Sequence, residues 1–195
     1  MAAAGKKHRL LLYTRLFGVL RVPSLLIAVS CGLLWWFAPA PFDSDLAQAG
    51  LLVVAVICGL LFSYALVGPA LSYVQCLPKY VCVRTPLYRL VISYSRIRTV
   101  RPILFSPAGL RWSQRSFVEP FVGRTFVALD LSRYPLSERW LRLWLNEFMF
   151  DKDFTGLLFV TEDWMALSRD IDVHRSEWKT RHVQERLRAT SSAYR

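Results

Sequence analysis

Two long stretches of the chain contain no charged residue, over residues 22–42 and 46–78. Leucine, valine, alanine and aromatic residues fill most of both stretches. The hydrocarbon core of a bilayer is about 30 Å thick, and about 20 apolar residues in a helix cross it. The pattern therefore predicts two transmembrane helices, at about 22–37 and 50–72, which form a hairpin covering residues 22–76.

Two other interpretations of these stretches are less favoured. Buried helices of soluble proteins are rarely free of charge over such lengths. A cleaved signal peptide also begins with cations and an apolar run, and Ala38-Pro39-Ala40 resembles its cleavage site. Pro41 follows directly, where proline is poorly tolerated, so we expect the first stretch to be retained as an anchor.

The net charge of +11 is distributed unevenly along the chain. Residues 1–21 carry five cations and no acid, and residues 79–124 carry nine cations and one acid. The loop between the two apolar stretches has two aspartates and no cation. Cytoplasmic flanks of membrane helices are enriched in Lys and Arg. We therefore expect a multi-pass protein of the cell inner (plasma) membrane, with both termini in the cytoplasm.

The first 21 residues form a basic lead-in that also contains leucine, tyrosine and phenylalanine. Such a segment can lie in the headgroup region with its cations extending to water. It can equally be the cytoplasmic end of the first helix, and both interpretations stay open. We favour an interfacial segment that is continuous with that helix.

Small side chains recur every four residues in both apolar stretches, and residues four apart share a helix face. The residues are Ser24, Ala28 and Gly32 in the first stretch, and Ala55, Gly59 and Ser63 in the second. Small residues let helix backbones approach closely in lipid. The simplest use is packing of the two helices on each other, and a partner protein's helix is the alternative.

Aromatic residues stand at the ends of the apolar stretches. Trp35 and Trp36 end the first stretch, and Tyr73 and Tyr80 follow the second. Tryptophan and tyrosine are enriched at both membrane–water interfaces. We expect the tryptophans at the outer interface and the tyrosines at the inner one.

After residue 76 the pattern changes to short β-branched and aromatic runs, which predicts a cytoplasmic α+β domain over residues 77–195. The predicted strands are Tyr80–Thr85, Tyr88–Tyr94, Ser95–Arg101, Thr125–Leu131 and Gly156–Thr161, with one more near Leu110–Trp112. Predicted helices cover Glu138–Phe150, with Ser137 as its N-cap, and Trp164–Ala189. Trp140 and Trp144 recur at helical spacing, so we expect both in the core.

The segment Tyr80–Pro102, YVCVRTPLYRLVISYSRIRTVRP, together with the preceding hairpin, resembles the bacterial membrane-anchored PH-like proteins. The triplet Ser95-Arg96-Ile97 stands where that family has a similar triplet leading into the next strand. The resemblance implies a binding or scaffolding role and assigns no catalytic residue. After Arg101 the family's glycine-rich hairpins are missing, and the helix Glu138–Phe150 takes the place of further strands. The expected fold is thus a modified PH-like barrel with C-terminal helices.

The basic run after the second helix is the candidate contact surface. Each Lys or Arg near an anionic leaflet contributes roughly 1 kcal/mol of attraction. The residues expected to contact lipid or a partner are Lys79, Arg84, Arg89, Arg96, Arg98 and Arg101. For Lys79 and Arg84, fixing the orientation of the hairpin is an equal alternative. We do not expect nucleic acid to be the partner, because no known nucleic-acid motif is present.

Sequence signals for catalysis are missing. There is no Gly-rich phosphate loop, no Gly-x-Ser-x-Gly and no His-Glu-x-x-His motif, and the four cysteines contain no Cys-x-x-Cys pair. His174 and Glu177 form a single pair on a helix, too little for a metal site. We expect no enzyme, cofactor or metal. Two hypotheses remain: a binding module that contacts anionic lipid or protein, and an accessory subunit of a larger integral-membrane complex.

Overall fold

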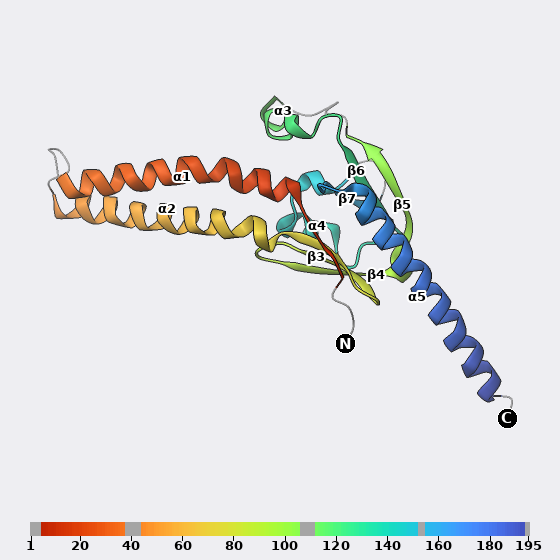
Figure 1. The fold of residues 1–195 in the computed structure, drawn as a ribbon. Coiled ribbons are helices and arrows are strands. Elements are labelled where there is room, and N and C mark those ends of the chain that lie inside the picture. Colours follow the sequence, from red (N-terminus) through yellow and green to blue (C-terminus); the bar gives the residue numbers. More distant parts are fainter. Residues whose placement is uncertain (1–4, 38–43, 106–111, 152–154, 194–195) are drawn as a thin grey trace. The chain divides into compact units, whose positions relative to one another are not determined.

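The computed structural model describes residues 5–37, 44–105, 112–151 and 155–193, and the chain divides into two units (Figure 1). One unit, Leu12–Leu71, is a pair of long apolar helices. The other, Met1–Leu11 with Ser72–Arg195, is an α+β unit with antiparallel sheets. The expected combination of two apolar helices and an α+β region is confirmed.

The helical pair consists of α1 (Leu11–Phe37) and α2 (Asp45–Leu71), each 27 residues long. At 1.5 Å per residue each helix is about 40 Å long. Both are long and apolar enough to cross a membrane. Apolar side chains are exposed along both helices: Val22, Leu26, Val29, Leu33, Val53, Val56, Leu60 and Val67. Helix α1 begins eleven residues before the predicted position, because Leu11–Arg21 continues the helix despite its cations.

The two helices pack closely around Phe17. Its ring is buried and meets the Tyr64 ring edge-on, with 5.4 Å between centroids. A Cβ atom added at Gly68 would lie 2.5 Å from the Phe17 ring, so only glycine fits there. Pro69 has no N–H to donate to the Ala65 carbonyl one turn earlier. Arg21 Nε donates to that carbonyl instead, at 3.0 Å.

The first sheet of the α+β unit has the antiparallel order β1-β2-β3-β4. Its strands are β1 (Lys7–Arg9), β2 (Tyr73–Cys76), β3 (Tyr80–Arg84) and β4 (Arg89–Ser93). Beyond the last β1–β2 pair, Leu10 N donates to Ser72 O at 3.1 Å. The helical pair is therefore an insertion in the turn between two neighbouring strands.

This arrangement corrects the predicted boundaries. The domain does not begin at residue 77, because β2 already belongs to the sheet, and the hairpin ends at Leu71 rather than at residue 76. The lead-in, residues 1–21, is also not one segment. Lys7–Arg9 is a strand whose middle residue, His8, points into the core, and the helix begins at Leu11.

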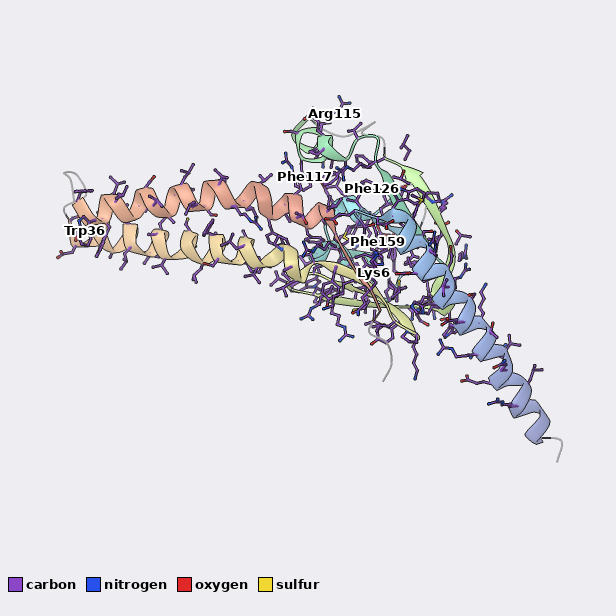
Figure 2. The ribbon with its side chains drawn as sticks, viewed as in Figure 1. Lys6, Trp36, Arg115, Phe117, Phe126 and Phe159 are labelled. Atoms are coloured by element: carbon purple, nitrogen blue, oxygen red, sulfur yellow. The ribbon has the colours of Figure 1, made fainter. Side chains whose placement is uncertain are left out.

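The second sheet has the antiparallel order β5-β6-β7, with β5 (Ile97–Leu104), β6 (Thr125–Leu131) and β7 (Gly156–Phe159). A 3₁₀ turn, Tyr94–Arg96, connects it to β4, so Arg96 precedes the strand in which it was expected. Helix α3 (Trp112–Val118) lies between β5 and β6. Trp112 is thus helical and not in a strand, while residues 110 and 111 lie outside the described residues. Phe126 and Phe159 are buried on this sheet (Figure 2).

Helix α4 (Glu138–Trp144) is shorter than predicted. It ends because the Asn146 side chain caps a separate 3₁₀ turn, Glu147–Met149, by accepting from Phe148 N at 3.0 Å. Ser137 occupies the N-cap position without a side-chain hydrogen bond. Leu141 and Leu145 are buried, whereas Trp140 is half exposed. The prediction that Trp140 belongs to the core is wrong.

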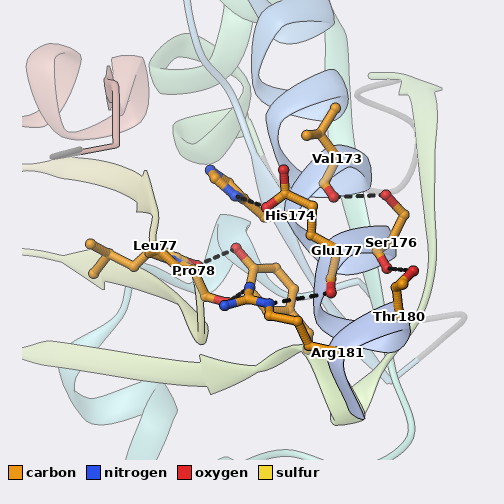
Figure 3. A network of polar contacts seen from close by, with 9 residues as sticks. Leu77, Pro78, Val173, His174, Ser176, Glu177, Thr180 and Arg181 are labelled. Carbon is orange, nitrogen blue, oxygen red and sulfur yellow. Dashed lines mark hydrogen bonds and ion pairs between the residues drawn. The ribbon is translucent and has the colours of Figure 1, made fainter. Parts of the chain in front are cut away.

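Helix α5 (Trp164–Ala193) closes the α+β unit. Asp163 caps its start, since Ala166 N donates to Asp163 Oδ1 at 2.8 Å. The helix is fixed to the first sheet by His8 Nε2 and Asp170 Oδ2, which are 2.9 Å apart. Arg181 Nη2 also donates to Pro78 O, in the turn between β2 and β3, at 2.7 Å (Figure 3). Residues 179–188 are all exposed, so the last turns of the helix extend beyond the sheets (Figure 1).

Candidate functional site

Four residues from four strands form one row across the outer face of the first sheet. Arg9 pairs with Tyr73, Tyr73 with Arg84, and Arg84 with Arg89. The neighbouring row is buried: His8, Val74, Val83 and Leu90. Successive residues of a strand point to opposite faces, so the first row faces outward. We call Arg9, Tyr73, Arg84 and Arg89 the arginine row.

Two tyrosines and a lysine surround these guanidinium groups. Arg84 Nη1 donates to the Tyr73 hydroxyl at 3.4 Å, and Lys7 Nζ lies 4.8 Å from the centre of the Tyr73 ring. Arg89 Nη2 donates to the Tyr80 hydroxyl at 3.3 Å. The tyrosine hydroxyls therefore hold the arginine side chains along the sheet surface.

The electrostatics of the row favour an anion. Arg84 and Arg89 are directly opposite each other on antiparallel strands, where like charges destabilise the pairing. The four strands contain no Asp or Glu, and within the described residues no ion pair is found for Arg9, Arg84 or Arg89. A hydrogen bond from Arg89 Nε to the Cys82 sulfur raises the pKa of Arg89 further above its ordinary value. Phosphate or carboxylate is the ligand chemistry that guanidinium groups match.

Two buried side chains of the α+β unit, Cys76 and Tyr94, have raised pKa values. Burial, with a smaller effect of the Asp170 charge, raises the pKa of the Cys76 thiol to about 12. Burial is also the main cause that raises the pKa of Tyr94, whose hydroxyl donates to Leu77 O at 2.8 Å. These groups hold the sheet together and are not available for chemistry.

The row lies at a defined end of the sheet. Arg9 is two residues before the start of α1 at Leu11, and Tyr73 is two residues after the end of α2 at Leu71. Two residues of extended chain span about 7 Å at most. The arginine row is therefore at the end of the sheet where the chain passes into and out of the apolar helices.

The six cations expected to act together lie in three places. Arg84 and Arg89 belong to the arginine row. Lys79 is exposed in the β2–β3 turn, at the opposite end of the sheet. The others are on or next to the second sheet.

Two of those three have partners within the α+β unit. Arg96 donates to Tyr134 O at 3.2 Å, and Arg101 lies 3.5 Å from Asp130. Arg98 is exposed on β5, and its backbone carbonyl accepts from Arg175. The sequence prediction missed Lys7 and Arg9, which the β1–β2 pairing brings to the row. Three residues are too few for a periodic signal, so the sequence pattern alone could not have found them.

The six small residues expected to pack the helices differ in their surroundings. Ser24 is buried, and its hydroxyl donates to Leu20 O at 2.7 Å. Ala28, Gly32, Ala55 and Gly59 are half-buried, and Ser63 is exposed. A Cβ atom at Gly32 or Gly59 would meet nothing within 4 Å, so neither glycine is needed for the approach of α1 to α2. The close approach occurs at Gly68 instead, which the prediction missed.

The four interface aromatics also divide into two groups. Trp35 and Trp36 are exposed near the end of α1. Figure 2 shows Trp36 there. Tyr73 and Tyr80 are half-buried on the first sheet, where they bind arginine side chains. The two tyrosines therefore contact the arginine row. That the four aromatic residues lie at membrane–water interfaces stays a prediction.

The other places considered as functional sites offer fewer groups for binding or catalysis. In residues 5–37, 44–105, 112–151 and 155–193, no group of three or more His, Cys, Asp or Glu side chains could hold a metal ion. His174 Nδ1 and Glu177 Oε2 are 3.6 Å apart, a single pair on α5 (Figure 3). An open depression lined by Ser176, Glu177, Thr180 and Arg181 follows the same helix. The hydroxyls of Ser176 and Thr180 donate to carbonyls of their own helix, so this depression offers few free polar groups.

No family model, curated protein or solved structure matches the chain.

Proposed function

We propose that this chain is a non-enzymatic, membrane-anchored binding module whose arginine row contacts the phosphates of anionic lipid headgroups. The observation that carries the proposal is the arginine row, with three arginines and one tyrosine on one sheet face. No acidic partner of these arginines is found among the described residues, and the row lies at the end of the sheet where the chain enters and leaves the apolar helices. Cytoplasmic leaflets are anionic, and their phosphates supply the missing counter-charge.

The order of strands supports a modified PH-like module. The described residues contain seven strands in two antiparallel sheets, of four and three strands, followed by a long C-terminal helix. Seven strands is the number in a PH barrel, although the Tyr80–Pro102 resemblance led us to expect a modified relative and not a strict seven-strand barrel. The apolar helices between β1 and β2, and the helices α3 and α4, would be the modifications.

The pairing of β1 with β2 also supports a hairpin that crosses the membrane twice. The two strands flank the apolar helices and belong to one sheet, so both flanks lie on the same side of any membrane that the helices span. The cations of Lys7, Arg9, Arg84 and Arg89 then make that side the cytoplasmic one under the positive-inside rule.

The expected attraction follows from the number of cations. At roughly 1 kcal/mol for each Lys or Arg near the surface, the three arginines and Lys7 contribute about 4 kcal/mol. Salt weakens this attraction, because the Debye length is about 8 Å at physiological ionic strength. Covalent attachment keeps the row near the headgroups, so the contact forms without a separate binding step from solution.

The test compares the full-length chain in nanodiscs of zwitterionic lipid and in nanodiscs that also contain phosphatidylglycerol. Amide hydrogen exchange of β3 and β4 reports the contact. We expect about tenfold slower exchange in the anionic nanodiscs, and loss of this difference in the R84Q/R89Q variant. The matched control, R115Q/K179Q, removes the same charge from two exposed positions outside the row. Equal exchange of the unmodified chain in both lipids would refute the lipid contact.

The second candidate function is an accessory subunit of a larger integral-membrane complex. Gly32 and Gly59 favour it, because both are dispensable for the approach of α1 to α2 and leave room for another helix. Purification in mild detergent followed by mass spectrometry tests this function. A single species without a stoichiometric partner argues against it.

A further inference from the structure

The turn between β3 and β4 presents a leucine to solvent. Thr85 fixes this turn: its N–H donates to Tyr88 O at 2.8 Å, and its hydroxyl accepts from Tyr88 N at 3.1 Å. Pro86 restricts the backbone at the second position. Leu87 stands at the tip and is 71% exposed. The tip of a tight turn usually carries a polar residue, so an exposed leucine is unusual at this position.

Helix α4 adds two more exposed apolar side chains next to this turn. The Tyr88 ring stacks on Trp144 with 5.8 Å between centroids, and Trp144 lies 6.1 Å from Trp140. Trp140 is 50% exposed and Leu143 is 69% exposed. Positions 140, 143 and 144 share one side of the helix, opposite the buried leucines. We call Leu87, Trp140 and Leu143 the apolar edge.

The apolar edge and the arginine row are at the same end of the first sheet. Arg84 directly precedes the Thr85–Tyr88 turn and Arg89 directly follows it, while Arg84 pairs with Tyr73. This is the end at which the chain continues into α1 and arrives from α2. Apolar side chains flanked by arginines match the two layers of a membrane interface, acyl chains and phosphates.

We propose that the apolar edge inserts into the interfacial region of the leaflet whose phosphates contact the arginine row. This inference rests on the proposed function and adds an apolar component to it. Tryptophan and leucine are the residues that amphipathic membrane-binding segments bury at this depth. A protein groove could also cover exposed leucines, but the two arginines beside Leu87 favour an anionic surface over a neutral groove. The α+β unit would then be held on the leaflet by apolar contact as well as by charge.

The test measures how deep individual side-chain positions lie in the lipid, with the full-length chain reconstituted in phosphatidylglycerol-containing nanodiscs. Single nitroxide labels are placed at L87C and L143C, and at S95C as the control. Ser95 is exposed and lies just beyond the far end of β4, about 20 Å along the strand direction from the turn. We expect a water-soluble nickel chelate to reach the labels at 87 and 143 at least threefold less than the label at 95, while oxygen reaches them more.

The background of this experiment carries Cys31→Ala and Cys58→Ala. Cys76 and Cys82 are buried, and the same background without an added cysteine serves as the labelling blank. Equal nickel access at all three labels overturns the inference. Labels at 87 and 143 that are shielded from nickel but also from oxygen indicate a protein contact, such as a second copy of this chain, and overturn it as well.

The two proposals fail in different ways. Loss of the arginine contact appears as equal hydrogen exchange in zwitterionic and anionic nanodiscs, a comparison that uses no label. If the apolar edge does not insert, the nickel chelate reaches the labels at positions 87 and 143 as readily as the label at position 95. This result can occur even where amide hydrogen exchange depends on the lipid. Each readout therefore decides its own proposal.

Discussion

The insertion of the helical pair between β1 and β2 predicts how the α+β unit can be isolated. Leu10 and Ser72 are hydrogen-bonded neighbours at the end of the strand pair. Joining them through Asn-Gly creates a two-residue β-hairpin loop, for which this dipeptide is strongly preferred. We expect the chain 1–10–Asn-Gly–72–195 to fold without the helices. The chain 77–195, which keeps everything after β2, is expected not to fold.

The expected difference follows from what the shorter chain loses. It lacks Leu10 and Val74, both fully buried, each worth about 2 kcal/mol. It also lacks the hydrogen bonds between β2 and β3, about 1 kcal/mol each, and the contact of His8 with Asp170. The sum is on the order of 8 kcal/mol, comparable to the whole stability of a typical domain, about 5–15 kcal/mol. The exposed edge of β3 would further promote aggregation.

Size-exclusion chromatography and urea unfolding followed by circular dichroism measure the difference. The joined chain should elute as a monomer and unfold in one cooperative transition. The 77–195 chain should aggregate or show no transition. The reasoning fails if 77–195 is monomeric and unfolds at the same urea concentration as the joined chain.

Three further outcomes follow from single contacts. Gly68→Ala should destabilise the helical pair by about 1–3 kcal/mol in detergent unfolding, because its Cβ would overlap the Phe17 ring, and Phe17→Leu should relieve the loss. Asp170→Asn should lower the urea stability of the joined chain by about 1–2 kcal/mol and speed amide exchange in α5, because His8 loses a charged partner. The pKa of Cys76 is raised to about 12 by burial, so the folded state keeps a proton that the unfolded chain loses from about pH 9. The free energy of unfolding should therefore fall as the pH rises from about 9 to about 12, and Cys76→Val should reduce this fall.

The first two of these outcomes have a matched control. Gly59→Ala adds the same methyl group where nothing lies within 4 Å, and should leave the helical pair unchanged. Asp172→Asn removes the same charge from an exposed position of α5. A loss in either control equal to that of the paired variant would contradict the assignment. An unchanged pH dependence in Cys76→Val would exclude the thiol as its source.

The sequence was most informative where the structure depends on local pattern. The absence of charge predicted the two apolar helices, and the β-branched and aromatic run Thr125–Leu131 predicted β6 at its observed bounds. The end of α4 was missed because Asn146 forms a local cap that ends the apolar periodicity of Glu138–Phe150.

The strand β1 and the arginine row were not predicted, because they depend on pairing between residues far apart in the sequence. The periodicity of a segment does not show such pairing. The three-residue strand Lys7–Arg9 is too short for a periodic signal and gains its structure from β2, more than sixty residues later. Without that pairing Arg9 cannot be assigned to a row with Arg84 and Arg89. Trp140 was placed in the core because helical spacing shows which residues share a face, but not whether a neighbour covers that face.

The position of the helical pair inside a β-turn also has a consequence for biosynthesis. Strand β1 leaves the ribosome before any of its partners, and β2 follows only after both apolar helices. The first sheet can therefore close only after both helices have been synthesised. If only one helix crossed a membrane, β1 and β2 would lie on opposite sides of it and could not pair in the first sheet. Under the proposed membrane anchoring, folding of the α+β unit requires that the chain cross the membrane an even number of times between β1 and β2. A chain with a single crossing would carry unpaired strand edges, which promote aggregation.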